Sequence, residues 1–191
     1  ITDVDSAVDL PPVRGQVAFE NVSFRYPTGD LVLNEVSLEV KPGQTVALVG
    51  HSGAGKTSLV NLVPRFFEPV SGRILIDGYD ISRVKLESLR SQIAIVLQDP
   101  FLFNGTVLEN IRYASPDATM DDVRAAAKAA YAQEFIDNLA EGYETEIGER
   151  GVKLSGGQKQ RLSIARALLA DRRILILDEA TAMIDSQAEY Q

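Results

Sequence analysis

A glycine-rich loop at residues 50–57, with the sequence GHSGAGKT, limits the possible folds of this chain more than any other feature. It matches the pattern G-x-x-x-x-G-K-[ST], which cradles phosphate groups when it lies between a strand and a helix. The apolar run 45–49 before it predicts a buried strand, and a helix is expected from Thr57 to about Val63. The loop therefore predicts an α/β fold with a phosphate site. A glycine-rich turn without a ligand is the weaker alternative.

The residue types of the loop indicate the role of each position. Glycines let several backbone N–H groups converge on phosphate oxygens, and the start of the helix adds positive potential. Lys56 is expected to reach the β- and γ-phosphates and to act in catalysis, and Thr57 is expected to offer its hydroxyl to Mg²⁺. The other predicted nucleotide contacts are Gly50, Ser52, Gly53, Ala54, Gly55 and Ser58.

Two adjacent carboxylates, Asp178 and Glu179, follow the apolar run 174–177. The carboxyl end of a strand in an open α/β sheet is where such folds bind ligands. Asp178 is the expected Mg²⁺ ligand, through water, because Mg²⁺ prefers oxygen ligands and keeps part of its hydration shell. Glu179 is the expected catalytic residue that polarises the attacking water. Two solvated acids at the end of a strand are the alternative.

A second glycine-rich loop, LSGGQ at residues 154–158, precedes another predicted helix. A glycine pair at the start of a helix is an anion site by its geometry, and Ser155 is a natural N-cap or phosphate ligand. Taken alone, such a turn is usually structural. The order of the two loops and the acidic strand end favours a second phosphate site, with Ser155, Gly156, Gly157 and Gln158 as nucleotide contacts.

Hydrophobic periodicity indicates the remaining elements. Strands are predicted at 17–24, 33–40, 73–76 and 93–97, the first two as a hairpin and the third followed by a tight Asp77-Gly78 turn. A Thr-x-x-Asp capping box at Thr119 opens an Ala-rich helix. In the helix after the second loop, one apolar face would hold Leu162, Ala165, Leu168 and Leu169. These elements indicate an α/β core with a helical insert.

In the order of these motifs, the chain resembles the nucleotide-binding domain of an ABC (ATP-binding cassette) transporter from about residue 15 to residue 191. The phosphate loop corresponds to the Walker A motif, residues 174–178 to Walker B, and residues 154–158 to the signature motif. The resemblance implies a P-loop NTPase (RecA-like) core with an antiparallel β-subdomain and an inserted α-helical subdomain at about 99–158. It also implies that residues 1–14 are a linker from a preceding transmembrane domain.

Two more residues acquire roles through this resemblance. Gln98 is the expected Q-loop glutamine, which senses Mg²⁺ and the γ-phosphate and is therefore both a catalytic residue and a metal ligand. Tyr26 lies where the adenine-stacking aromatic of the family lies, and a core tyrosine is its alternative. ATP is the implied nucleotide, and Mg²⁺ is the implied metal.

Two stretches are similar to exporter-type domains in particular. They are QDPFLFNGTV at 98–107 and TEIGERG at 145–151, which resembles the exporter x-loop. In exporters these segments meet the transmembrane domain, whereas acid- and aromatic-rich surface loops are the alternative. The resemblance implies two domains that dimerise head to tail through the signature motif and the D-loop Asp185, at the cytoplasmic face of a membrane. The expected function is ATP hydrolysis that powers export.

The composition narrows the competing functions. A net charge of −8 argues against a nucleic-acid partner, because such surfaces need a basic face. No apolar run approaches the roughly 18 residues of a membrane helix, and the absence of cysteine excludes disulfides and thiolate metal sites. The alternatives that remain are a soluble ABC ATPase, a non-hydrolytic nucleotide-binding module and an importer ATPase subunit.

The chain departs from the family pattern in two places. Residues 182–184 read Ala-Met-Ile before Asp185, where exporters usually have Ser-Ala-Leu. The switch histidine of the family lies beyond the D-loop, but the sequence ends at Gln191, and its one histidine is His51 in the phosphate loop. We therefore expect these 191 residues to hydrolyse ATP slowly or not at all, and an intact protein to be active. The motifs identify neither the transported substrate nor the choice between homodimer and heterodimer.

Overall fold

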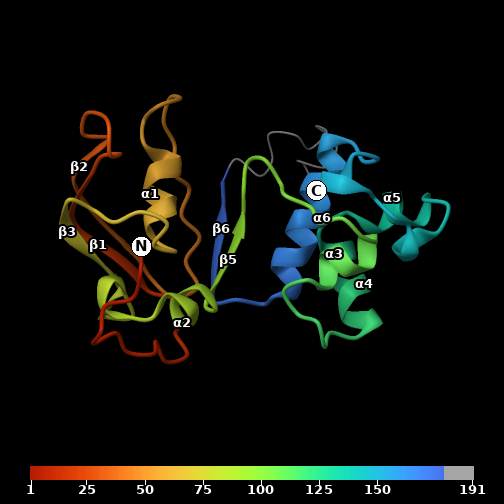
Figure 1. Ribbon diagram of the computed structural model, residues 1–191, viewed down its shortest axis with the longest axis horizontal. Coiled ribbons are helices and arrows are strands. Elements are labelled where there is room, and N and C mark those ends of the chain that lie inside the picture. Colours follow the sequence, from red (N-terminus) through yellow and green to blue (C-terminus); the bar gives the residue numbers. More distant parts are fainter. Residues whose placement is uncertain (179–191) are drawn as a thin grey trace. The chain divides into compact units, whose positions relative to one another are not determined.

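The structure is a computed structural model that describes residues 1–178 (Figure 1). The chain divides into two compact units, the first ending at Ile93 and the second beginning at Ala94. Predicted site residues occur in both units. The phosphate loop belongs to the first, and Gln98, the signature motif and Asp178 belong to the second. Glu179 and Asp185 lie outside the described residues.

The first unit is built on an antiparallel four-stranded sheet with the order β2-β1-β3-β4. Its strands are β1 (Val17–Phe24), β2 (Leu33–Val40), β3 (Ser71–Ile76) and β4 (Tyr79–Asp80). Val17 pairs with Val40 of β2 on one side and with Ile76 of β3 on the other. The predicted hairpin and third strand are therefore confirmed.

The predicted turn between β3 and β4 is also confirmed. Asp77 and Gly78 both have positive φ, at 47° and 84°, which is the backbone of the tight turns that join antiparallel strands. The Asp77 carboxylate accepts hydrogen bonds from the backbone N–H groups of Arg14 and Gln16. The turn thereby ties the segment before β1 to the edge of the sheet.

The predicted linker, residues 1–14, is packed against the first unit. Leu10 and Val13 are each 5% exposed, and the Leu10 N–H donates to Ser88 Oγ at 2.9 Å. The contact partners are a 3₁₀ turn (Ile81–Arg83) and helix α2 (Leu86–Arg90). Burial of two apolar side chains makes this segment part of the folded unit rather than a free tether.

Arg65, which lies three residues after the end of helix α1 (Lys56–Leu62), bonds the same region. Its side chain is 2% exposed, and its guanidinium donates to the carbonyl oxygens of Ile81, Val84 and Thr2, each at 3.3 Å. It also forms an ion pair with Glu68 at 2.8 Å. Arg65 has a positive φ of 56°, a conformation that residues other than glycine seldom adopt.

The predicted buried strand at 45–49 is the one element that the structure contradicts. Neither described sheet includes these residues, and the side chain of Val49 is 93% exposed. An apolar run becomes a strand only where a neighbouring backbone pairs with it, and periodicity alone cannot supply that neighbour. The helix that follows the phosphate loop was predicted correctly and is α1.

The second unit contains a two-stranded sheet of β5 (Ile93–Val96) and β6 (Ile174–Leu177). The Asp178 N–H donates to the Val96 carbonyl at 2.9 Å, which continues the pairing past the end of β6. Ala94 and Val96 pack against Ala167 of helix α6. Both strands were predicted, and the pairing places their ends, near Gln98 and Asp178, side by side.

Among the described residues of the second unit, helix α6 (Gly156–Leu169) runs alongside α3 (Val107–Arg112) and α4 (Met120–Ala129) (Figure 1). The same part of the chain also contains helix α5 (Gln133–Asp137) and two 3₁₀ turns, Gly142–Glu144 and Glu149–Gly151. Fully buried core side chains include Leu102, Ile111, Val123, Ile136, Ile147 and Leu162. The Thr119 capping box is present, but Leu168 is 37% exposed, so its assignment to the apolar face of α6 was wrong.

Candidate functional site

The lysine of the phosphate loop is hydrogen-bonded to the backbone of the same loop. The Lys56 ammonium donates to the carbonyl oxygens of Gly50 at 2.9 Å and His51 at 3.1 Å. The His51 carbonyl also accepts the Ala54 N–H at 3.2 Å. These bonds bend the loop around the Lys56 side chain at the start of α1, so that a cation lies within the loop that was predicted to hold phosphate.

Glycine is required at position 55 of this loop. Gly55 is the N-cap of α1 with φ +86°, and a Cβ there would lie 2.9 Å from Leu33 Cδ2. A left-handed backbone and a close neighbour both exclude larger residues. The loop residues 50–54 are exposed, which allows an anion to approach the loop.

Tyr26 connects an aromatic cluster to the phosphate-loop helix. Its ring makes edge-on contacts with Phe24 and Phe67, at centroid distances of 4.9 Å and 5.2 Å. Its hydroxyl shares a 2.9 Å hydrogen bond with Oγ of Ser58, which is buried on α1. These contacts suit the core alternative, and the half-buried ring leaves adenine stacking as a prediction.

The signature motif forms the N-terminal cap of α6. Gln158 donates its N–H to Ser155 Oγ at 3.3 Å, and the Ser155 N–H donates to Gln158 Oε1 at 2.9 Å. This reciprocal capping box confirms the predicted N-cap role of Ser155. Gly156 is exposed and Gly157 is half-buried, and phosphate contact at these positions stays a prediction.

The two exporter-like segments, predicted separately, pair with each other. Thr106 and Glu146 form an antiparallel bridge. On either side of it the Val107 N–H donates to the Thr145 carbonyl at 3.1 Å, and the Ile147 N–H donates to the Gly105 carbonyl at 3.0 Å. Segments nearly forty residues apart in sequence therefore form one surface of the second unit.

The donor chemistry of the predicted metal ligands fits Mg²⁺. Thr57, Gln98 and Asp178 offer hydroxyl, amide and carboxylate oxygens, which are the ligand types that Mg²⁺ prefers. Gln98 and Asp178 follow the paired strands β5 and β6. Within residues 1–178, no group of three or more His, Cys, Asp or Glu side chains could hold a metal without other ligands. A nucleotide-bound metal that keeps its waters does not need one.

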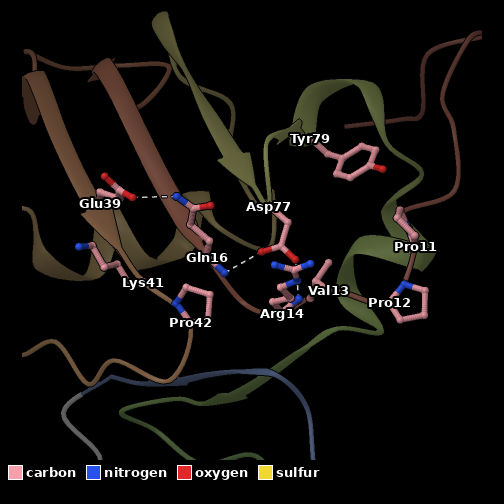
Figure 2. Close-up of a pocket in the computed structure, with 10 residues that line it drawn as sticks. All are labelled: Pro11, Pro12, Val13, Arg14, Gln16, Glu39, Lys41, Pro42, Asp77 and Tyr79. Carbon is pink, nitrogen blue, oxygen red and sulfur yellow. Dashed lines mark hydrogen bonds between the residues drawn. The ribbon is translucent and has the colours of Figure 1, made fainter.

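A cavity of about 600 Å³ lies elsewhere on the first unit (Figure 2). Its lining includes Pro12, Arg14, Glu39, Asp77 and Tyr79, and none of the predicted site residues. Figure 2 shows Asp77 and Glu39 already bonded to Gln16, at 2.8 Å in each case. The motifs, rather than this cavity, therefore identify the functional site.

Sequence reasoning assigned no role to two buried polar side chains of the second unit, which bond residues 97–106. Asn110 of α3 is 1% exposed, and Gln160 of α6 is fully buried. The available signal was the position of each residue. Asn110 lies three residues after Val107 and next to Ile111, where an amphipathic helix normally carries an apolar residue.

The fold and these motifs define an ATP-binding domain of the P-loop class. Residues 33–182 match the family model described as "ABC transporter", and the chain belongs to that family. The predicted family and fold are thus confirmed, and the domain class is one that binds nucleotide.

Three relatives illustrate the match. The ATP-binding/permease protein YgaD of Bacillus subtilis is 55% identical over 99% of the chain, which covers 33% of that protein. The ATP-dependent lipid A-core flippase of Chromobacterium violaceum is 53% identical over 97% of the chain and 32% of its own length. A solved bacterial Atm1-family ABC exporter with ATP bound is 48% identical, with a TM-score of 0.94 over all of this chain and 33% of that one. The chain thus spans about a third of the length of these relatives.

None of the helices among residues 1–178 has both the length and the apolar character needed to cross a membrane.

Proposed function

We propose that this chain is the domain that binds and hydrolyses ATP to power export of a substrate across a membrane. The observation that carries the proposal is the phosphate loop. Its exposed backbone surrounds the Lys56 ammonium, which is held at 2.9 Å and 3.1 Å by loop carbonyls. Support also comes from the relatives, whose names describe export ATP-binding/permease proteins and flippases.

The residues of the phosphate loop would bind and orient ATP. Lys56 would exchange one of its carbonyl partners for a β- or γ-phosphate oxygen, because an ammonium group bonds a charged oxygen more strongly than a neutral one. Thr57, Gln98 and Asp178 would hold Mg²⁺, which neutralises charge on the phosphate oxygens when it is bound. Glu179 would orient the water that attacks the γ-phosphorus and accept its proton, so that ATP and water give ADP and phosphate.

The signature motif would serve a phosphate held by a second ABC domain in a head-to-tail dimer. Ser155 Oγ accepts the Gln158 N–H, so its hydroxyl proton is left to donate to a phosphate oxygen. The exposed Gly156 allows close approach, and the N-terminus of the 14-residue helix α6 adds favourable potential. Asp185 of the D-loop would contact the same partner.

The paired segments around Thr106 and Glu146 would receive the transmembrane domain at the cytoplasmic face of the membrane. Their pairing supports a single docking surface, because movement of one segment must move the other. Residues 1–14 would connect to that domain. Their packing on α2 would pass movement of the tether directly into the first unit.

Substitution Glu179→Gln in the intact protein tests this function. We expect ATP binding to be retained, hydrolysis to fall by about 10²- to 10⁴-fold, and a closed dimer to accumulate. Glu134→Gln, an exposed carboxylate of α5, is the matched control and should hydrolyse ATP normally. Normal hydrolysis by the Glu179 variant would remove that residue from catalysis and favour another assignment. An intact protein that binds ATP but never hydrolyses it would favour the non-hydrolytic module instead.

A further inference from the structure

Helix α6 contacts the chain after Gln98 through one arginine. Arg166 donates from Nη1 to the Phe101 carbonyl at 3.0 Å and from Nε to the Asn110 carbonyl at 2.8 Å. Its Nη2 donates to Asn110 Oδ1 at 3.0 Å. A single guanidinium therefore joins the signature helix, the segment 98–106 and helix α3.

Asn110 extends this network along the same segment. Its Nδ2 donates to the carbonyls of Phe103 at 3.0 Å and Thr106 at 2.9 Å, while its Oδ1 also accepts the Phe103 N–H at 2.8 Å. Residues 98–105 form no helix or strand. Their backbone groups at Phe101 and Phe103 are instead hydrogen-bonded by the side chains of Arg166 and Asn110. The side chain of Asn110 is 1% exposed, which protects its hydrogen bonds from competing water.

Aromatic rings fix the orientation of the Arg166 guanidinium. Its central carbon lies 5.3 Å from the Phe103 ring centroid and 5.8 Å from that of Tyr113. Those two rings stack on each other with centroids 4.0 Å apart. Burial lowers the pKa of Arg166 from its ordinary value, but an arginine remains charged at neutral pH. Only the planar fork of arginine can bond three oxygens and stack in this way.

The backbone on both sides of Gln98 is bonded to other elements of the same unit. On its N-terminal side, Val96 O accepts the Asp178 N–H at 2.9 Å, and Leu97 O lies 3.5 Å from Nε2 of the buried Gln160. On its C-terminal side, the Phe101 carbonyl is held by Arg166. Gln160 and Arg166 both belong to α6, so the helix that begins at the signature motif bonds the chain before and after Gln98.

We propose that Arg166 is a positioning residue for ATP hydrolysis, which fixes the segment after Gln98 to the signature helix so that Gln98 and Ser155 move together. The inference rests on the role proposed above for Gln98. Arg166 acts through the Phe101 carbonyl, to which its Nη1 donates. Loss of the fork would free Gln98 while the nucleotide-binding loop, which belongs to the first unit, stays intact.

Steady-state kinetics of Arg166→Gln in the intact protein test the proposal. We expect kcat for ATP hydrolysis to fall by about 10- to 100-fold, because small misplacements of a catalytic group have effects of this size. The KM for ATP should change by less than about threefold, since ground-state binding is left in place. Arg166→Lys keeps the charge but not the fork and should restore little of the rate. Arg161→Gln is the matched control on α6. Its guanidinium lies 5.5 Å from the Phe135 ring, within the helical cluster, and kcat should be unchanged.

Two further measurements separate positioning from a general loss of structure. Hydrogen–deuterium exchange without nucleotide should accelerate at residues 100–104 in Arg166→Gln but not in Arg161→Gln. The double variant Gln98→Ala/Arg166→Gln should be no slower than Gln98→Ala alone, because both changes remove the same contribution. Multiplicative effects in the double variant, or unchanged kcat in Arg166→Gln with accelerated exchange, would overturn the proposal. Wild-type hydrolysis by Gln98→Ala would overturn it together with the role proposed for Gln98. A slow Gln98→Ala beside a normal Arg166→Gln would overturn the positioning role alone.

Discussion

Replacement of Arg65 by alanine and by glycine separates two effects that the structure combines at one residue. The Arg65 guanidinium bonds three backbone carbonyls and the half-exposed Glu68. Each lost hydrogen bond to a neutral acceptor costs about 1 kcal/mol, and the Glu68 pair adds less than about 1 kcal/mol because Glu68 is solvated. We therefore expect Arg65→Ala to lower the free energy of unfolding by about 3 kcal/mol.

Arg65→Gly removes the same side chain but also relieves the backbone. At φ 56° a residue with a Cβ is strained by about 1–2 kcal/mol relative to glycine. Glycine should therefore be the more stable of the two variants by about 1 kcal/mol, although glycine elsewhere usually destabilises a protein relative to alanine.

Urea unfolding of the chain followed by circular dichroism measures both differences, because the sequence has no tryptophan to report by fluorescence. Arg83→Ala, an exposed arginine of the same region, is the control and should change stability by less than about 0.5 kcal/mol. A glycine variant less stable than the alanine variant would refute the role of the backbone. A loss below about 1 kcal/mol in both would refute the anchoring role of the guanidinium.

Three further predictions follow from local geometry. Lys56→Ala should weaken binding of a fluorescent ATP analogue by at least about tenfold, because it removes the cation of the phosphate loop. Ser155→Asp should keep the α6 cap and therefore the thermal stability, but it should lose ATP hydrolysis because it places a negative charge against phosphate. Ser155→Ala should also lose hydrolysis, and its free energy of unfolding should fall by about 1 kcal/mol because the cap is removed. Hydrogen bonds from the Thr119 hydroxyl and N–H lower the pKa of Asp122 below its ordinary value of 3.8, so this contribution to stability is present above pH 3.8 and is lost as the pH falls through the lower folded pKa. Acid titrations should show a weaker pH dependence for Thr119→Ala, and an unchanged one would contradict the assignment.

Much of the fold could be predicted because its signals are local. The hairpin of β1 and β2, the Asp77-Gly78 turn and the caps at Thr119 and Ser155 each depend on residues a few positions apart. Periodicity failed at 45–49 and at Leu168, where the outcome depends on a neighbour distant in sequence. The packing of residues 1–14 was missed for the same reason, since Arg65 and Ser88 hold them from far along the chain.

The sequence by itself determined the class of this protein and predicted the residues of its phosphate site. Motif spacing is contained within short segments, and the glycine, lysine and carboxylate chemistry of each segment has few other uses. Only the tertiary structure decided which segments distant in sequence are hydrogen-bonded to each other. The pairing of Thr106 with Glu146 and the bonds from Arg166 to Phe101 and Asn110 connect residues about forty to sixty-five positions apart. Such contacts form because a buried polar group must find a partner, and the folded chain determines which partner is within reach.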